Sequence, residues 1–131
     1  MDSGVMQDPR RLRVYPRSKG LAVGVLEAIK RFPADGHADL KKQMKRSVES
    51  IVFNIAEGCG ADTRAEFARF LGISIKSAFE LDGQLDLSSD YRIISVQTST
   101  KLKKELEAVR KMLYRLRQRV LGYGDDQSEN D

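Results

Sequence analysis

Apolar residues recur at helical spacing in four separate stretches of the chain. In residues 18–32, Leu21, Val25, Ile29 and Phe32 follow one another at steps of four, four and three, which places them on one face of a helix. Similar stripes run through residues 39–57, from about Arg64 to the Ser88-Ser89-Asp90 run, and through residues 96–121. The pattern predicts four amphipathic helices.

Residues that start or stop helices flank these stretches. The expected caps are Ser18, Thr63 (paired with Glu66 in a capping box) and Ser95, and the expected stops are Pro33 with Gly36, Gly58-Cys59-Gly60, and Gly122 with Gly124. Residues 1–16 contain two prolines and are interpreted as an irregular N-terminal arm. Residues 17–122 then form the bundle domain, and residues 123–131 form a disordered acidic tail.

Four amphipathic helices joined by short connections bury their stripes most simply as an all-α, up-down-up-down antiparallel four-helix bundle. The clearest strand candidate, residues 91–94, is too short and isolated to found a sheet. A chain of 131 residues is long enough for one such domain.

Composition excludes several classes of protein. One cysteine and one histidine cannot supply a structural zinc site, and no apolar run approaches the roughly 20 residues that span a membrane. We therefore expect a cytoplasmic protein with no metal and no cofactor. Cys59 could be a redox-sensitive thiol, and His37 is interpreted as a loop or first-turn residue. The run Gly58-Cys59-Gly60 fits a helix end better than a phosphate-binding loop, since it lacks the Gly-Lys-Ser/Thr ending.

Positive charge is concentrated in two segments. The net charge is +4, but residues 10–31 and residues 96–124 each sum to +6. Such asymmetry indicates a polyanionic partner, although each run could also be a solvated helix face. The candidate nucleic-acid-binding residues are Arg10, Arg11, Arg13, Arg17, Lys103, Lys104, Arg110, Lys111, Arg115 and Arg117. Within the fourth helix they form an outer row of Lys104, Lys111 and Arg115, and a second row on its flank of Lys103, Arg110 and Arg117.

Polar residues form stripes beside the apolar stripes of the second and third helices. We expect them to meet in a structural seam that fixes helix register, with Asn54 pairing with Glu80, and Glu57 with Arg69. Ser77 belongs to the same seam. The functional alternative is a polar pocket in which Glu57 acts as acid or base, but no nucleophile–base pair is visible.

Three apolar residues lie away from the core stripes: Phe53, Ile75 and Phe79. They are consistent with a buried contact between subunits. The alternative, that the N-terminal arm with Val14 and Tyr15 folds over them, remains open at this stage.

Two sequence motifs resemble one known family. They are the helix end Asn54-Ile55-Ala56-Glu57-Gly58 and the later pair of motifs Glu66-Phe67-Ala68-Arg69-Phe70-Leu71 and Ser77-x-x-Glu80-Leu81. They resemble the small bacterial proteins encoded in intervening sequences of 23S ribosomal RNA genes, also called S23 ribosomal proteins. The chain departs from the family at Cys59-Gly60-Ala61, where a basic residue is usual, and at Lys76, where glycine is common.

The resemblance implies a cytosolic four-helix bundle that assembles as a homopentamer without enzyme activity. Similar bundles are accessory subunits of reverse transcriptases in retroelements, where a basic surface binds the enzyme and nucleic acid. The leading hypothesis is therefore non-enzymatic binding of RNA or DNA with weak sequence preference, with a reverse transcriptase as one candidate protein partner. The alternative is an oligomeric scaffold that binds a protein and no nucleic acid.

Overall fold

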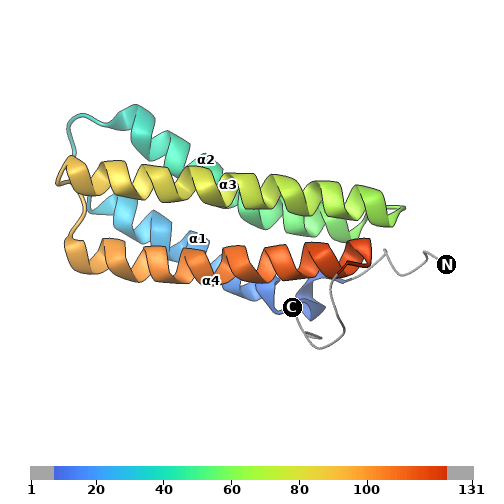
Figure 1. The fold of residues 1–131 in the computed structure, drawn as a ribbon. Helices are drawn as coiled ribbons and strands as arrows, with labels where there is room; N and C mark the ends of the chain where they lie inside the picture. The colour runs from blue at the N-terminus through green and yellow to red at the C-terminus, as the bar shows by residue number, and fades with distance from the viewer. Residues whose placement is uncertain (1–7, 124–131) are drawn as a thin grey trace.

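The computed structural model describes residues 8–123, which form an antiparallel bundle of four helices (Figure 1). After a short 3-10 helix, η2 (Pro9–Arg11), the chain forms α1 (Val14–Lys30), α2 (Ala38–Cys59), α3 (Arg64–Asp90) and α4 (Val96–Leu121). Successive helices run in opposite directions, and residues 8–123 contain no strand. The predicted all-α up-down-up-down bundle is confirmed.

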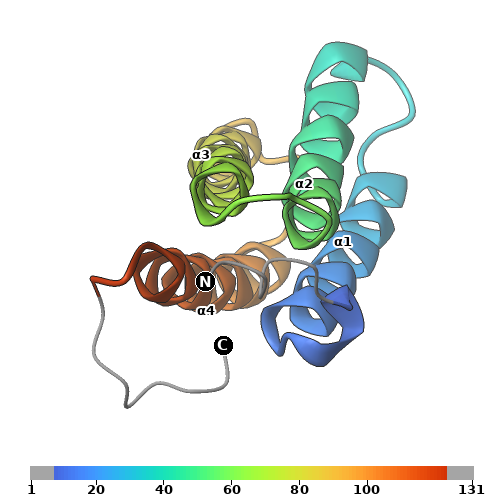
Figure 2. The ribbon, with the colours of Figure 1, turned by 90° about the vertical axis from the view of Figure 1, so that its right-hand side faces the viewer.

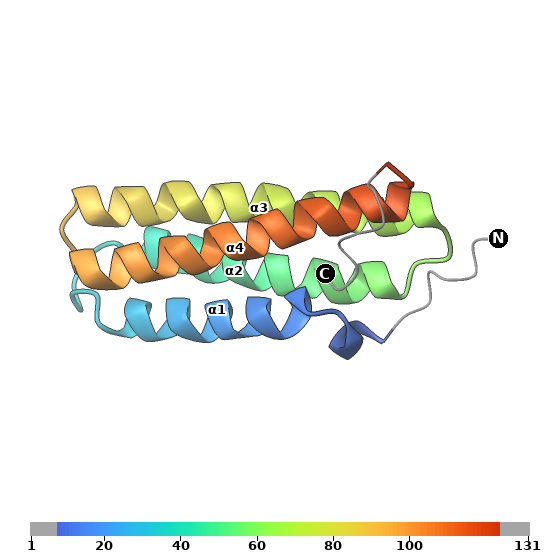
Figure 3. The same cartoon turned by 60° about the horizontal axis from the view of Figure 1, so that its bottom comes forward.

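The four helices occupy the corners of the bundle in chain order. Seen end-on in Figure 2, α1 neighbours α2, α2 neighbours α3, α3 neighbours α4, and α4 closes the bundle against α1. Figure 3 shows α4 lying between α1 and α3. The α2–α3 seam and the α1–α4 seam therefore face opposite sides of the molecule.

The core is built from the predicted apolar stripes. The largest side chains that are almost completely removed from solvent come from all four helices: Leu21, Met44, Ile51, Ile55, Phe67, Leu71, Leu81, Leu85, Leu106 and Leu113. Each fully buried side chain of this size contributes about 1.5–3 kcal/mol relative to exposure. Packing of these stripes holds the helices together.

The predicted signals at three helix ends act as expected. The Thr63 side chain accepts a hydrogen bond from the backbone N–H of Glu66 at 3.1 Å, and Ser95 accepts one from Thr98 at 3.1 Å. Both bonds satisfy N–H groups that a helix leaves free in its first turn. Gly122 takes a left-handed φ of 84° at the end of α4, a conformation that glycine adopts without steric cost.

The boundary between the N-terminal arm and the first helix was misplaced. Helix α1 begins at Val14, so Pro16 lies in its first turn, where a helix needs no N–H donor. Ser18 is not a cap: it is buried, and its hydroxyl donates to the Tyr15 carbonyl at 2.7 Å. Leu12 and Val14 are buried in the core, so this part of the predicted arm closes one end of the bundle.

Two other helix ends also extend beyond their predicted limits. The run Ser88-Ser89-Asp90 forms the last turn of α3, and the Ser88 hydroxyl donates to the Gln84 carbonyl at 2.8 Å within its own helix. Helix α2 continues through Cys59 and is capped at Gly60. The predicted acidic tail lies outside the described residues, apart from Tyr123.

Candidate nucleic-acid interface

A groove runs along the seam where α1 meets α4. It has a volume of about 500 Å³ and is lined by Arg17, Gly20, Leu21, Val23, Gly24, Lys101, Leu102, Lys104 and Glu105. The groove is open at Gly20, where an added Cβ would meet no atom within 4 Å, whereas a Cβ on Gly24 would lie 3.0 Å from the Leu102 side chain, which packs closely against that glycine. The groove therefore has an apolar floor with charged residues along both rims.

One ion pair bridges the two rims of this groove. The Arg17 guanidinium donates to both carboxylate oxygens of Glu105, at 3.0 Å and 2.9 Å. These hydrogen bonds raise the pKa of Arg17 above its usual value. The pair lies near the surface, so its charges are accessible to solvent.

Two lysines on the α4 rim have no acidic partner. Within the part of the chain that the structure describes, Lys101 and Lys104 are exposed and make no ion pair. They stand one helical turn apart, so both project from the same side of α4. The groove therefore presents two uncompensated positive charges. Lys101 was not among the candidates predicted from the sequence, although its i, i+3 spacing to Lys104 was a signal that could have found it.

The outer face of α4 continues this basic surface. Lys111 and Arg115 are exposed and lie about two and three turns along the helix from Lys104. Lys111 is paired with Glu107 at 3.3 Å, so the two charges cancel at that turn. Of the predicted outer row, Lys104 is the residue with the most available charge.

The second predicted row of α4 is occupied by contacts with α3. Lys103 hydrogen-bonds to Asp86 and lies 3.5 Å from Asp82, and these contacts raise its pKa. Arg117 donates from Nε to the Ala68 carbonyl at 3.0 Å, and the Arg110 guanidinium lies 5.0 Å from the centre of the Phe79 ring. These residues hold α4 against α3, so we remove them from the set available for phosphates.

The N-terminal arginines are divided in the same way. Arg10 forms a salt bridge with Asp8 at 2.8 Å, and hydrogen bonding to that carboxylate raises its pKa. Arg11 and Arg13 are exposed, and no ion pair involving them is found among residues 8–123. Arg11 ends η2 and Arg13 is the N-cap residue of α1, the helix that carries Arg17.

The polar seam between α2 and α3 exists, but the predicted pairs do not form. Asn54 donates to the carbonyl and hydroxyl oxygens of Ser50 on its own helix, at 2.8 Å and 3.1 Å, and Arg69 pairs with Glu66 at 2.8 Å. Ser77 makes the contact between helices by donating to the Ser50 hydroxyl at 2.7 Å. Glu57 and Glu80 are exposed. Asn54 and Arg69 each have a partner three or four residues away on their own helix. These local pairs form in place of the pairs predicted across the seam.

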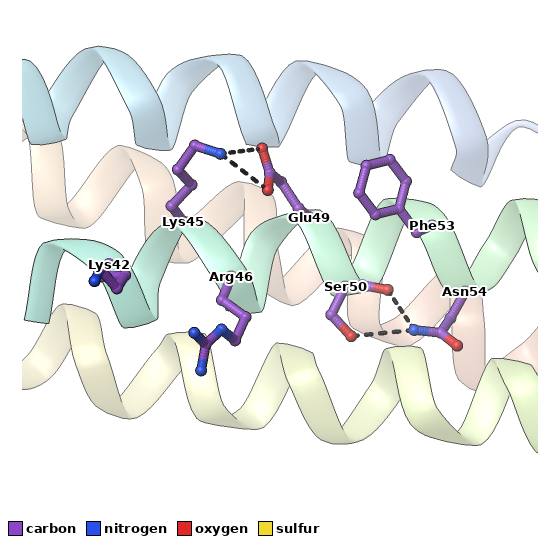
Figure 4. Close-up of a pocket in the computed structure, with 7 residues that line it drawn as sticks. All are labelled: Lys42, Lys45, Arg46, Glu49, Ser50, Phe53 and Asn54. Atoms are coloured by element: carbon purple, nitrogen blue, oxygen red, sulfur yellow. Dashed lines mark hydrogen bonds and ion pairs between the residues drawn. The ribbon is translucent and has the colours of Figure 1, made fainter. Parts of the chain in front are cut away.

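The three off-stripe apolar residues do not form one patch. Phe53 lies on the outer face of α2 and is 60% exposed, whereas Phe79 lies on the α4 side of α3 and is 58% exposed (Figure 4 shows Phe53). Ile75 is only partly exposed and packs against the core. The N-terminal segment does not cover either phenylalanine, so that alternative is wrong for the described residues.

Cys59 is a core residue. It is buried at the end of α2, and this burial, together with the nearby Asp8 carboxylate, raises the pKa of its thiol to about 11. The thiolate form that reacts with oxidants is therefore scarce near neutral pH. Among residues 8–123, no three His, Cys, Asp or Glu side chains gather closely enough to hold a metal ion. None of the described helices could cross a membrane.

Comparison with known proteins assigns the chain to a class and then to a family. Its fold is that of a solved bundle from the S23 ribosomal protein family of Bacteroides thetaiotaomicron, a protein of unknown function, with a TM-score of 0.75 and 26% identity over 80% of this chain and 95% of that one. Residues 10–115 match the 23S rRNA-intervening sequence protein family, and the chain belongs to that family. A search of curated proteins found no match.

Proposed function

We propose that this protein is a non-enzymatic nucleic-acid-binding protein that holds phosphates along the α1–α4 groove and the outer face of α4. The observation that carries the proposal is the meeting of the two most basic segments of the sequence. They lie at opposite ends of the chain, yet α1 and α4 are neighbours in the bundle. Two segments of like charge placed side by side raise the local positive potential.

The available charges support contacts to phosphate rather than to bases. Lys101 and Lys104 on one rim, and Arg13 near the start of the other, offer donors without acidic partners among residues 8–123. The groove carries no exposed aromatic side chain on which a base could stack. We therefore expect binding of RNA or DNA with little preference for sequence.

Binding to unrelated sequences at low salt tests this proposal. Fluorescence anisotropy with single-stranded RNA, single-stranded DNA and duplex DNA at ~50 mM salt should show binding of the wild-type protein. The double variant Lys101→Gln/Lys104→Gln should bind each of them more weakly. Its plot of log affinity against log salt should lose about 1.4 units of slope on single strands, because each phosphate contact contributes about 0.7.

A matched variant separates local contacts from overall charge. Lys42→Gln/Lys76→Gln removes the same charge from exposed positions on α2 and α3 and should change the slope much less. Glutamine is a good helix former, so both variants should fold. If the wild-type protein binds none of the three probes at ~50 mM salt, the scaffold function for a protein partner replaces this proposal.

We further propose that the protein works as a homo-oligomer, with a pentamer favoured. Phe53 and Phe79 are exposed on different faces, which suits a contact in which one face of a copy meets another face of the next, the kind of contact that closes rings. Light scattering should give about five times the chain mass of 14.8 kDa.

Phe79→Glu tests the interface without damaging the core. Because Phe79 is largely exposed in the single chain, the variant should keep its helical circular dichroism while the assembly dissociates. Val23→Glu, an exposed apolar residue on the groove face, is the control and should leave the mass unchanged. A wild-type monomer at micromolar concentration would contradict the oligomer.

A further inference from the structure

A polar pocket lies in the α2–α3 seam. Figure 2 shows that the α2–α3 pair of helices lies on the side of the bundle opposite the α1–α4 pair. It has a volume of about 330 Å³ and is lined by Gln43, Arg46, Ser47, Ser50, Ser77, Glu80 and Gln84. Figure 4 shows Arg46 extending from α2 toward α3, beside a second hollow on the outer face of α2 that shares Arg46 and Ser50 with the pocket. This volume is within the range of small-molecule sites, roughly 300–1,000 Å³.

Several polar groups of this pocket are not used by the fold. Gln84 Oε1 is buried and accepts no hydrogen bond in the described part of the chain. Arg46 has no acidic partner there, and the Ser47 hydroxyl makes no hydrogen bond although Ser47 is buried. By contrast, the buried Ser74 hydroxyl donates to the Ile51 carbonyl at 2.8 Å. Arg46 is exposed, so Gln84 Oε1 is the buried side-chain atom that lacks a partner among the described residues. Natural proteins rarely leave a buried polar atom without a partner, so this acceptor in a pocket that also offers donors indicates a missing ligand.

The available groups define the chemistry of that ligand. Arg46 and the Ser47 hydroxyl are donors suited to phosphate oxygens. Gln84 Oε1 and the Glu80 carboxylate are acceptors, and they require N–H or O–H groups from the ligand. A bare anion satisfies only the donors, and an uncharged sugar leaves Arg46 without a counter-charge. The pocket therefore matches a molecule that carries both a phosphate and hydroxyl groups.

We propose that the α2–α3 pocket binds a phosphate monoester of a hydroxylated small molecule, such as a sugar phosphate or a nucleoside monophosphate. Arg46 and Ser47 hold the phosphate, Glu80 accepts from sugar hydroxyls, and Gln84 accepts the hydrogen bond that its buried oxygen lacks in the free protein. The site shares no residue with the α1–α4 groove. The proposal consequently stands or falls independently of nucleic-acid binding.

Isothermal titration calorimetry of the full chain with ribose 5-phosphate and with adenosine monophosphate tests the pocket. At least one of the two should bind saturably with one site per chain. Ribose, adenosine and inorganic phosphate each lack one half of the chemistry and should bind at least about tenfold more weakly, since each lost hydrogen bond to a charged group costs about a factor of ten or more. Equal binding of inorganic phosphate would reduce the site to a general anion patch and overturn the proposal.

Substitutions locate the binding and separate it from a structural role. Arg46→Gln should weaken binding about tenfold or more, because a charge-assisted contact is lost, whereas Arg31→Gln, an exposed arginine at the end of α1, should not. Gln84→Met removes the unsatisfied oxygen, so it should raise the thermal midpoint of the free protein. The same change should lower the affinity for the ligand, because it removes an acceptor that the ligand uses. A purely structural glutamine would not give this opposite pair of effects.

The source of the phosphate is decided by competition. A single-stranded oligonucleotide added in excess should not displace the bound sugar phosphate, because the strand binds the opposite face. Displacement that depends on Arg46 would assign the pocket to nucleic acid instead of a free small molecule. Absence of saturable binding by both phosphorylated compounds, or binding unaffected by Arg46→Gln, would also overturn the proposal.

Discussion

The α2–α3 seam and the α1–α4 seam are held together by different means. At the α2–α3 seam, hydroxyls bond across the interface, and Gly58 lets α3 approach so closely that an added Cβ would lie 2.8 Å from the Phe67 ring. At the α1–α4 seam, Gly20 faces open space, and a solvent-exposed ion pair bridges the rims. The first seam uses Gly58 for close packing, whereas in the second Gly24 packs against Leu102 and Gly20 leaves an open groove.

We interpret the α2–α3 seam as the part of the bundle that contributes most to stability, and the α1–α4 seam as the part that is available for binding. A seam with close contact and shared hydrogen bonds loses stability when any member changes size. A seam with open space and uncompensated lysines tolerates change in the folded state and keeps surface free for a partner. The following predictions test that division, from the largest expected effect to the smallest.

Gly58→Val should be the most damaging of these changes. The added Cβ would come within 2.8 Å of Phe67 and 3.2 Å of Phe70, and Phe67 is too buried to move aside. We expect a loss of about 3 kcal/mol in the free energy of unfolding, measured by urea denaturation. A variant as stable as the wild type would show that the two helices can separate without cost.

Cys59 should make the α2 end of the bundle sensitive to alkaline pH. Its folded-state pKa of about 11 exceeds the ordinary value of 9.0, so the folded protein keeps a proton that the unfolded chain releases. The contribution is complete below pH 9 and is lost as pH rises toward 11, by about 2 kcal/mol. Cys59→Ala lacks this titration, so the stability difference between wild type and variant should shift in the variant's favour over that pH range.

Ser74→Ala should cost about 1 kcal/mol, because it removes a buried hydrogen bond between α3 and the Ile51 carbonyl of α2. Asn54→Ala is the comparison, since Asn54 bonds only within its own helix. We expect it to remain within about 0.5 kcal/mol of wild type. If urea denaturation ranks the two the other way round, the polar side chains of the seam are not what joins these helices.

Gly20→Ala should stabilise the protein by roughly 0.5–1 kcal/mol. Alanine is a better helix former than glycine, and its methyl group meets nothing in the open groove. The thermal midpoint measured by circular dichroism should rise accordingly. A lower midpoint would mean that the α1–α4 seam is packed as tightly as its counterpart.

Arg17→Gln should have the smallest effect on stability, below about 0.5 kcal/mol, because exposed ion pairs contribute little and are screened by salt. Glu105→Gln should match it, and a double-mutant cycle at low and high salt measures the coupling directly. Coupling that is strong and independent of salt would contradict the description of this seam as open.

Much of the fold is predictable because helices are specified locally. The stripe from Leu102 to Leu116 and the caps at Thr63 and Ser95 involve residues within one or two turns of each other, and the structure follows them closely. The errors arose where distant contacts intervene. Val14 and Leu12 are drawn into the end of the core, which starts α1 earlier than its local sequence indicated.

The candidate site was less predictable than the fold. Lys103 and Arg117 are basic residues of α4, as Lys104 is. The Asp86 carboxylate and the Ala68 carbonyl that accept their hydrogen bonds come from α3. Nothing near these residues in the sequence distinguishes them from Lys104. The pocket around Arg46 could not be predicted from the sequence for the same reason, because its lining residues come from two helices that only the fold brings together.

The sequence by itself determined the four helices, their apolar faces and the basic character of two segments, because periodicity, capping and charge are properties of neighbouring residues. Only the tertiary structure decided that α1 lies beside α4, that Gly58 meets Phe67, and that Lys101 and Lys104 keep their charges available. These outcomes depend on how the bundle closes. Closure is set by packing among residues that are far apart in the chain, which no local pattern records.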